Sequence, residues 1–77
     1  MNAYNEEGLR EGPWEVYIDG RLCYNGTYVN GKKHGVFEYY HSNGNLSYKE
    51  NYINGKECGL REGYYLNGEL IYKEYQL

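Results

Sequence analysis

Apolar and polar residues alternate along several short stretches of the chain. Residues 22–28, Leu-Cys-Tyr-Asn-Gly-Thr-Tyr, are a clear example, with leucine and tyrosine at the even positions. This period of two is typical of β-strands, and no stretch has apolar residues at helical spacing over three turns. Asx-Gly pairs typical of tight turns separate the alternating stretches. The expected strands lie near 13–18, 21–29, 36–41, 45–53, 60–66 and 69–76.

The alternating pattern repeats along the chain every 24 residues, and this period governs the expected architecture. The first repeat is one residue shorter, near Ile18-Asp19. We therefore expect one all-β domain over residues 1–77, a single-layer antiparallel meander of about six strands made of three β-hairpin repeats. A degenerate N-terminal cap spans 1–11, and the repeats span 12–34, 35–58 and 59–77. The series that carry the period are Tyr24, Tyr48 and Tyr72; Leu22, Leu46 and Leu70; Gly20, Gly44 and Gly68; and Tyr4, Tyr28 and Tyr52.

Turn chemistry fixes how each repeat folds. The Asx-Gly pairs at 19–20, 43–44 and 67–68 are typical of two-residue type I′ turns, in which both residues take positive φ. A longer loop then joins one hairpin to the next, at 30–35 and at 54–59. The glycines of these turns and loops are expected to supply left-handed conformations. The structural turn glycines are Gly20, Gly31, Gly35, Gly44, Gly55, Gly59 and Gly68.

A two-residue turn also predicts which side chains face each other. At Asn43-Gly44 it places Tyr39 opposite Tyr48 and Phe37 opposite Glu50. At Asn67-Gly68 it places Tyr65 opposite Leu70. Trp14 and Val16 join the same face if the residue missing from the first repeat falls after Val16. The result is a ladder of leucine and aromatic side chains, best explained as the core, on one face of a sheet whose other face is mostly polar.

Twelve tyrosines accompany one phenylalanine and one tryptophan. Tyrosine combines an apolar ring with a polar hydroxyl, so it suits a half-exposed surface better than a dry core. Exposed tyrosine gives a protein interface a large contact area at a small entropic cost. The candidate partner-binding residues are Tyr24, Tyr28, Tyr39, Tyr48, Tyr52, Tyr65, Tyr72 and Tyr75.

Charge and hydropathy exclude several classes of partner. The formal net charge is −3, with basic residues scattered among a larger number of acidic ones. Lys32, Lys33 and Lys56 lie at one loop end and form only a small basic group, so we do not expect nucleic acid as a partner. No apolar run reaches eight residues and the first residues have no signal-peptide pattern. We expect a cytoplasmic protein and no membrane partner.

No catalytic constellation is evident. Asp19 belongs to a turn, and neither His34 nor His41 has a nucleophile at a meaningful spacing. We expect no enzyme activity, no cofactor and no metal site. Cys23 and Cys58 are expected at opposite ends of the sheet, too far apart for a disulfide, and therefore as two free thiols.

The segment Tyr24 to Gly35, Tyr-Asn-Gly-Thr-Tyr-Val-Asn-Gly-Lys-Lys-His-Gly, resembles the MORN repeat, whose pattern is Tyr-x-Gly-x-aromatic-x-Asn-Gly-Lys-x-His-Gly. The second repeat departs from it, with Glu50 at the first glycine and Cys58 at the histidine. Segments 37–44 and 60–68, with Tyr-Tyr and a closing Asn-Gly, look more like the bacterial MORN variant, whose members are often antitoxin components. The resemblance implies an elongated single-layer sheet that acts as a scaffold or binding surface. Some eukaryotic members associate with membranes and phospholipids.

These observations lead to one functional expectation and one alternative. We expect a non-enzymatic protein-binding module, a small inhibitor or antitoxin-like protein of phage or bacterial type, that covers a site on a partner protein. The alternative is a self-associating scaffold or a membrane-associated or phospholipid-associated MORN module. The C-terminal strand 69–77 carries apolar side chains on both faces, Ile71, Tyr75 and Leu77 opposite Leu70 and Tyr72. We expect this strand to meet another chain, either a second copy in a homodimer or the target protein.

Overall fold

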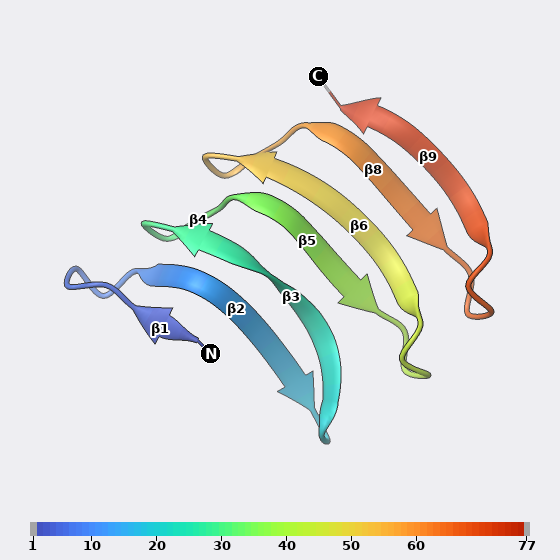
Figure 1. Ribbon diagram of the computed structural model, residues 1–77, viewed down its shortest axis with the longest axis horizontal. Helices are drawn as coiled ribbons and strands as arrows, with labels where there is room; N and C mark the ends of the chain where they lie inside the picture. The colour runs from blue at the N-terminus through green and yellow to red at the C-terminus, as the bar shows by residue number, and fades with distance from the viewer. Residues whose placement is uncertain (1, 77) are drawn as a thin grey trace.

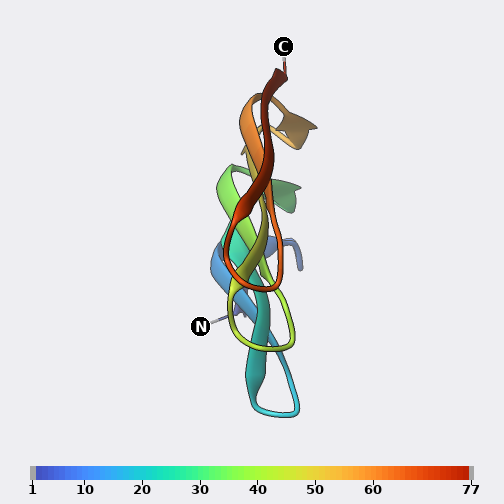
Figure 2. The same ribbon diagram turned by 90° about the vertical axis from the view of Figure 1, so that its right-hand side faces the viewer.

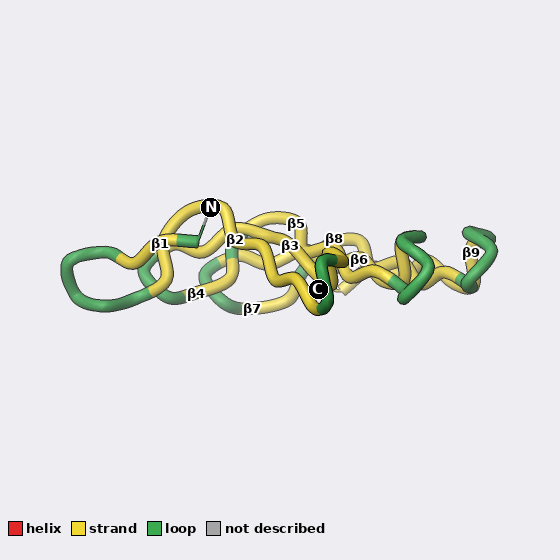
Figure 3. The backbone as a smooth tube through the Cα atoms, turned by 90° about the horizontal axis from the view of Figure 1, so that it is seen from below, coloured by secondary structure: helices red, strands yellow, loops and turns green. Residues whose placement is uncertain are grey.

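A computed structural model describes residues 2–76, which form a single open antiparallel sheet (Figure 1). Seen from the side and from below, the strands remain in one thin, twisted layer (Figures 2 and 3). The Cα atoms extend over 41 × 35 × 10 Å. The predicted all-β, single-layer meander is therefore confirmed.

Six long strands and three two-residue strands make up the sheet. Its order is β1-β2-β3-β5-β6-β8-β9, with β4 also paired to β3 and β7 to β6. The long strands begin and end within three residues of the predicted ones. They are β2 (Arg10–Ile18), β3 (Arg21–Val29), β5 (Gly35–Tyr40), β6 (Leu46–Ile53), β8 (Gly59–Tyr64) and β9 (Leu70–Gln76). The short ones are β1 (Ala3–Tyr4), β4 (Lys32–Lys33) and β7 (Lys56–Glu57).

The prediction of longer loops at 30–35 and 54–59 is wrong. Asn30-Gly31 and Asn54-Gly55 have positive φ at both residues and form tight turns that start β4 and β7. The amide of His34 donates to Thr27 O at 2.9 Å, so pairing with β3 continues between β4 and β5. The amide of Cys58 donates to Asn51 O at 2.8 Å, so pairing with β6 likewise continues between β7 and β8. Together with the equivalent segment 5–12, which joins β1 to β2, we name these segments the first (5–12), second (30–35) and third (54–59) hairpin tips. Their backbone hydrogen bonds are made within the sheet.

At the other end of the sheet, the three hairpin turns are not alike. Asp19-Gly20 is the predicted two-residue turn, with φ of 51° and 77°. The type I′ prediction is wrong for the other two pairs, where only Gly44 and Gly68 have positive φ. Their turns have three residues, closed by hydrogen bonds from His41 N to Asn45 O and from Tyr65 N to Glu69 O. This difference explains the missing residue of the first repeat. All seven predicted turn glycines have positive φ.

Each hairpin carries one β-bulge on its second strand, close to the turn. In β2–β3 the register shifts between Val16 and Tyr17, and Cys23 has no partner. Ser47 and Ile71 are its equivalents in the later hairpins. The predicted pairs of Phe37 with Glu50 and Tyr39 with Tyr48 are confirmed, and Trp14 lies opposite Gly26. Tyr65 opposite Leu70 is wrong, because the three-residue turn places Tyr64 there.

The buried core is aromatic and lies on one face of the sheet. Trp14, Tyr28 and Phe37 are buried, and Phe37 has no exposed surface. The side chains that pack against this cluster are Val16, Tyr24, Tyr39 and Tyr52.

The leucine part of the predicted ladder is wrong. Leu22 and Leu46 are half-buried outside the buried cluster, and Leu70 is exposed. The cause is the bulge, which interrupts the alternation between each leucine and the tyrosine two residues later.

Candidate binding surface

Two rows of aromatic rings cross the core face of the sheet. The alternation of side chains and the strand register bring them together from six strands. The first, which we name the packed row, has neighbouring ring centres 5.4–5.7 Å apart in edge-to-face contact. The second, the tyrosine row, has ring centres 5.4, 5.9 and 6.4 Å apart. The packed row is Tyr4, Trp14, Tyr28, Phe37 and Tyr52, and the tyrosine row is Tyr24, Tyr39, Tyr48 and Tyr72.

Two glycines let rings lie directly on the backbone. A Cβ atom on Gly26 would stand 2.4 Å from the ring of Phe37, and one on Gly63 would stand 2.3 Å from the ring of Tyr72. Each ring therefore covers a backbone that any other residue would shield with its own side chain. This close approach gives the glycine in the Tyr-x-Gly-x-Tyr segment at 24–28 a packing role.

A cation lies over the packed row in each of the first two hairpin tips. The Arg10 guanidinium lies 4.8 Å from the Trp14 ring centre and donates a hydrogen bond to Tyr28 Oη at 3.0 Å. Lys33 Nζ lies 4.8 Å from the Tyr52 ring centre and 5.1 Å from that of Phe37. Such contacts attract the cation to the negative face of the ring.

Lys33 also fixes a member of the tyrosine row, by donating a hydrogen bond to Tyr39 Oη at 3.1 Å. Burial alone would lower the pKa of Lys33, but the bond to Tyr39 and the nearby Glu50 charge outweigh it and raise that pKa. Lys33 is therefore charged at neutral pH.

The third repeat has ion pairs where the first two have rings. Arg61 replaces Phe37 at the equivalent position, and Glu57 replaces Lys33. Arg61 lies 3.2 Å from a Glu57 oxygen and 3.3 Å from a Glu74 oxygen, and it donates a hydrogen bond to Tyr48 Oη at 3.0 Å. The Tyr48 hydroxyl is therefore also held in place, as the Tyr39 hydroxyl is by Lys33.

Glu50 is a buried carboxylate beneath the aromatic surface, with 8% of its surface exposed. It accepts a hydrogen bond from Tyr52 Oη at 2.8 Å. Burial, followed by this bond, raises the pKa of the Tyr52 hydroxyl. Burial likewise raises the pKa of Tyr39, against the opposing effect of Lys33. These hydroxyls are neutral hydrogen-bonding groups across the physiological pH range.

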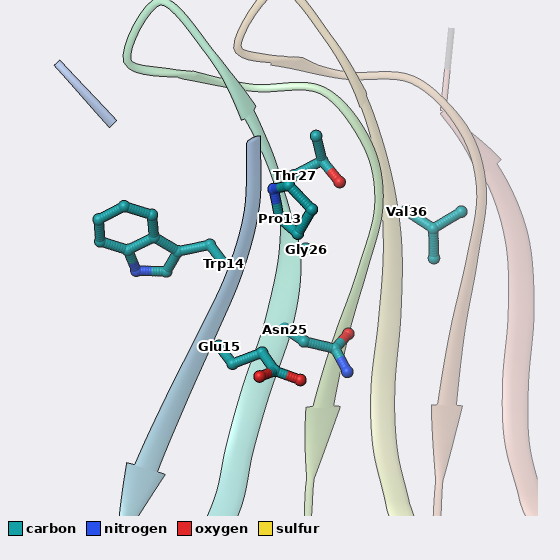
Figure 4. A pocket seen from close by; sticks show the side chains of 7 residues that line it. All are labelled: Pro13, Trp14, Glu15, Asn25, Gly26, Thr27 and Val36. Atoms are coloured by element: carbon teal, nitrogen blue, oxygen red, sulfur yellow. The ribbon is translucent and has the colours of Figure 1, made fainter. Parts of the chain in front are cut away.

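The opposite face carries polar side chains together with apolar ones such as Val36 and Tyr75, and its hollows are shallow. A hollow of about 300 Å³ lies on it, with Pro13, Glu15, Asn25, Thr27 and Val36 in its lining. In Figure 4, Trp14 points away from these side chains, as expected from the alternation along β2. The hollow brings together no group of titratable side chains.

The structure brings six of the eight predicted tyrosines onto the aromatic face. Tyr28 among them is buried and belongs to the core, with 5% of its surface exposed. Tyr75 lies on the other face, opposite Leu60, and is 76% exposed. Tyr65 lies at the β8–β9 turn and is 54% exposed. The six on the aromatic face are Tyr24, Tyr28, Tyr39, Tyr48, Tyr52 and Tyr72.

Sequence reasoning did not identify Arg10 and Lys33 as part of this surface. The signal was present, because both precede the last glycine of a hairpin tip by two residues, in Gly8–Gly12 and Gly31–Gly35. Their shared place in the repeat predicts a shared position on the sheet.

Groups for other chemistry are sparse in the described part of the chain. Residues 2–76 contain no cluster of three or more histidine, cysteine, aspartate or glutamate side chains that could hold a metal ion. His41 is used structurally, with Nε2 2.9 Å from Tyr64 O. Cys23 and Cys58 are free and half-buried, as predicted. Within the same residues, no helix is long and apolar enough to cross a membrane.

Comparison with known protein families, with curated proteins and with solved structures gave no match.

Proposed function

We propose that this chain is a non-enzymatic protein-binding module, of the small inhibitor or antitoxin-like kind, that covers a site on a partner protein. The observation that carries the proposal is the tyrosine row. Tyr24, Tyr39 and Tyr48 are half-buried, and Tyr72 is 38% exposed. Four rings on one face thus keep accessible surface while packing against one another.

The tyrosine row is already ordered without a partner. Its rings contact their neighbours, and the hydroxyls of Tyr39 and Tyr48 are bonded to Lys33 and Arg61. Side chains that are already ordered lose little conformational entropy on binding. Rigid tyrosines are also the anchors that protein interfaces use most effectively. The two free thiols suit the reducing cytoplasm that we expect for this protein.

The alternative, a self-associating scaffold, is supported by strand β9. Leu70, Ile71 and Tyr75 are 47%, 49% and 76% exposed. Within residues 2–76, no strand pairs with the outer edge of β9. Exposed apolar side chains beside an open strand edge favour pairing with another chain, including a second copy. A MORN-like module with this property would act as a scaffold or associate with phospholipid.

Affinity capture from the cells that naturally produce the protein tests these proposals. The matched variants are Tyr72→Ser and Tyr75→Ser, which lie on the same strand and on opposite faces. We expect one stoichiometric protein partner, lost with Tyr72→Ser by about tenfold or more in affinity and retained with Tyr75→Ser. Circular dichroism establishes that both variants are folded. Recovery of only the protein itself or of lipid, or equal binding by both variants, would contradict the tyrosine-row proposal.

A further inference from the structure

A groove of about 690 Å³ lies where the first three hairpin tips meet, at the end of the aromatic face. Its lining contains three basic side chains, Arg10, Lys32 and Lys33, together with the rings of Tyr4 and Tyr28 and the side chain of Leu9. No acidic residue lines it. This is unexpected in a chain with eight basic and eleven acidic residues.

Backbone hydrogen bonds and side-chain packing fix the shape of this groove. Gly31 N donates to Arg10 O and Gly55 N donates to Lys33 O, both at 2.9 Å. These bonds tie each hairpin tip to the preceding one. Side chains fill the contacts between them: Leu9 packs against Gly31 and the stem of Lys32 packs against Gly55. The groove is thus a built feature of stacked turns, and its walls need no reordering to receive a ligand.

The cations in the groove have donors to spare. Arg10 uses one nitrogen for Tyr28 Oη, and Lys33 uses its ammonium for Tyr39 Oη. A guanidinium has five N–H donors and an ammonium has three. The ion pairs found among residues 2–76 involve only Arg61 and Lys73 as cations. Glu50 lies close enough to raise the pKa of Lys33, but its hydrogen bond comes from Tyr52.

The third hairpin tip shows that the fold does not require an unpaired cation at this position. Glu57 occupies the place of Arg10 and Lys33 there, and it is neutralised by Arg61. The same backbone position therefore supports either arrangement. The first two tips leave positive charge accessible, and both charges lie beside the same groove.

We propose that this groove binds an acidic segment of a partner protein. Carboxylates of the segment bind Arg10, Lys32 and Lys33, and an apolar or aromatic side chain between them packs on Tyr4 and Leu9. The inference rests on the proposed protein-binding function and names the chemistry of the partner. Carboxylates bound to arginine or lysine form the stronger, charge-assisted class of hydrogen bond.

The groove suits a short acidic segment better than a nucleic acid. A phosphate backbone needs an extended basic track, because its affinity grows with each neutralised phosphate. Here the basic surface is short, because only Arg10, Lys32 and Lys33 contribute to it. Glu6 and Glu7 lie in the first hairpin tip. These charges repel a long polyanion and tolerate a short, locally acidic peptide.

A peptide titration followed by nuclear magnetic resonance tests the inference. The probe is acetyl-Gly-Glu-Tyr-Glu-Glu-Gly-amide, and its matched control replaces each glutamate with glutamine. We expect the acidic peptide alone to bind, with shifts centred on Gly8, Arg10, Gly31 and Lys33. Binding should weaken as salt screens the charges. Equal binding of both peptides, or shifts centred elsewhere, would overturn the inference.

Three variants that each remove one positive charge sharpen this titration. Lys32→Gln and Arg10→Gln change the lining, whereas Lys56→Gln removes an exposed charge of the third tip whose side chain does not line the groove. We expect the dissociation constant to rise about threefold or more for Lys32→Gln and further for Arg10→Gln. Lys56→Gln should leave it nearly unchanged. Equal losses for all three would show only general charge attraction and would overturn the site.

Two further probes distinguish an acidic peptide from nucleic acid and phospholipid as the ligand of this groove. Partner capture with a double variant distinguishes failure of the groove inference from failure of the proposed function. Tighter binding of hexathymidylate, or of anionic over neutral phospholipid vesicles, than of the acidic peptide would overturn the peptide assignment. If a captured partner is retained by Arg10→Gln/Lys32→Gln, the groove inference fails while the protein-binding function stands. If no partner is captured but the acidic peptide binds as described, the groove stands without the proposed function.

Discussion

The hairpin β5–β6 and the hairpin β8–β9 have nearly the same backbone and very different side-chain packing. Both have a three-residue turn, a bulge directly before the paired tyrosine of the second strand, and the same register. Phe37 in the first is fully buried beneath rings and Lys33. Arg61, at the equivalent place in the second, is held by glutamates. The repeat specifies the backbone geometry, and the individual side chains decide how strongly each hairpin is held.

The exposed fractions of the side chains also differ between the first strands of the sheet and the last hairpin. Trp14, Tyr28 and Phe37 form the buried core, and all three belong to β2, β3 and β5. In β9, Leu70, Ile71 and Tyr72 are each more than a third exposed. We therefore expect β8–β9 to open more easily than the first four long strands, because it buries less apolar surface.

The largest expected effect is that of Phe37→Ala. It empties a fully buried ring site and uncovers Gly26, so we expect the free energy of unfolding to fall by about 3–5 kcal/mol. A domain of this size has little more than that in total. Urea denaturation of Phe37→Leu gives a smaller, measurable loss if the alanine variant does not fold. Arg61→Ala is the matched change in the third repeat and should lower stability far less. Similar losses at both positions would contradict the contrast between the hairpins.

A second pair of variants adds one methyl group beneath each covering ring. Gly26→Ala pushes against Phe37, which has no space to move, and should destabilise the protein by about 1–3 kcal/mol. Gly63→Ala pushes against Tyr72, which is partly exposed and can swing outward. Its effect should be below about 1 kcal/mol by the same urea measurement. A larger loss for Gly63→Ala would show that Tyr72 is held as firmly as Phe37.

The tyrosine hydroxyls predict how stability depends on alkaline pH. The folded-state pKa values of Tyr39, Tyr52 and Tyr72 are raised, in each case first by burial. An unfolded tyrosine loses its proton near pH 10, so above about pH 10 the unfolded state binds fewer protons than the folded state. The stabilisation is therefore complete below that pH and is lost as the pH rises towards the folded-state values.

Tyr52→Phe tests this pH dependence at the hydroxyl whose pKa is raised most. The variant loses the hydrogen bond to Glu50 and should be less stable by about 1–2 kcal/mol at pH 7. Its stability should fall less between pH 9 and pH 11 than that of the parent, as measured by urea denaturation. Tyr75→Phe, at an exposed site on the other face, should keep the parent slope. Identical slopes for the parent and Tyr52→Phe would contradict the link between the raised pKa of Tyr52 and the loss of stability at alkaline pH.

The smallest expected effect is that of Glu74→Gln. It removes one ion pair of Arg61, with the Glu74 side chain 53% exposed, and Glu57 still neutralises the guanidinium. Exposed pairs of this kind contribute little to stability. We expect a change close to the error of a denaturation experiment. A loss comparable to that of Gly26→Ala would show that ion pairs hold the third hairpin as firmly as rings hold the second.

The sequence predicts the strands because alternation, glycine and Asx-Gly pairs act locally. It also locates the short turn of the first repeat. It does not reveal whether Asn43-Gly44 closes a two-residue or a three-residue turn, because both turns use the same residues. The bulge at Ser47 offsets the extra turn residue, so the pairs Tyr39–Tyr48 and Phe37–Glu50 were predicted correctly from the wrong turn. The pair Tyr65–Leu70 lies between bulge and turn, where nothing offsets the extra residue, and it was wrong.

The candidate surface was only partly predictable for a related reason. Periodic tyrosines identify one face, but burial depends also on the neighbouring strands. Phe37 lies over Gly26 inside the sheet and is fully buried, whereas Tyr72 lies over Gly63 in the last strand and is 38% exposed. Leu22 and Leu46 follow the same period and are only half-buried. The cations over the rings come from hairpin tips that the sequence suggested were loops.

The claim that side chains, and not the repeated backbone, set local stability is tested most directly by residue-resolved amide hydrogen exchange in the native state. We predict that the amides of β5 and β6 that are hydrogen-bonded within the sheet exchange only through global unfolding. Amides of β8 and β9 should exchange through a partial opening of lower free energy, and Phe37→Leu should reduce the difference. Equal protection in the two hairpins, or stronger protection in β8–β9, would contradict the account.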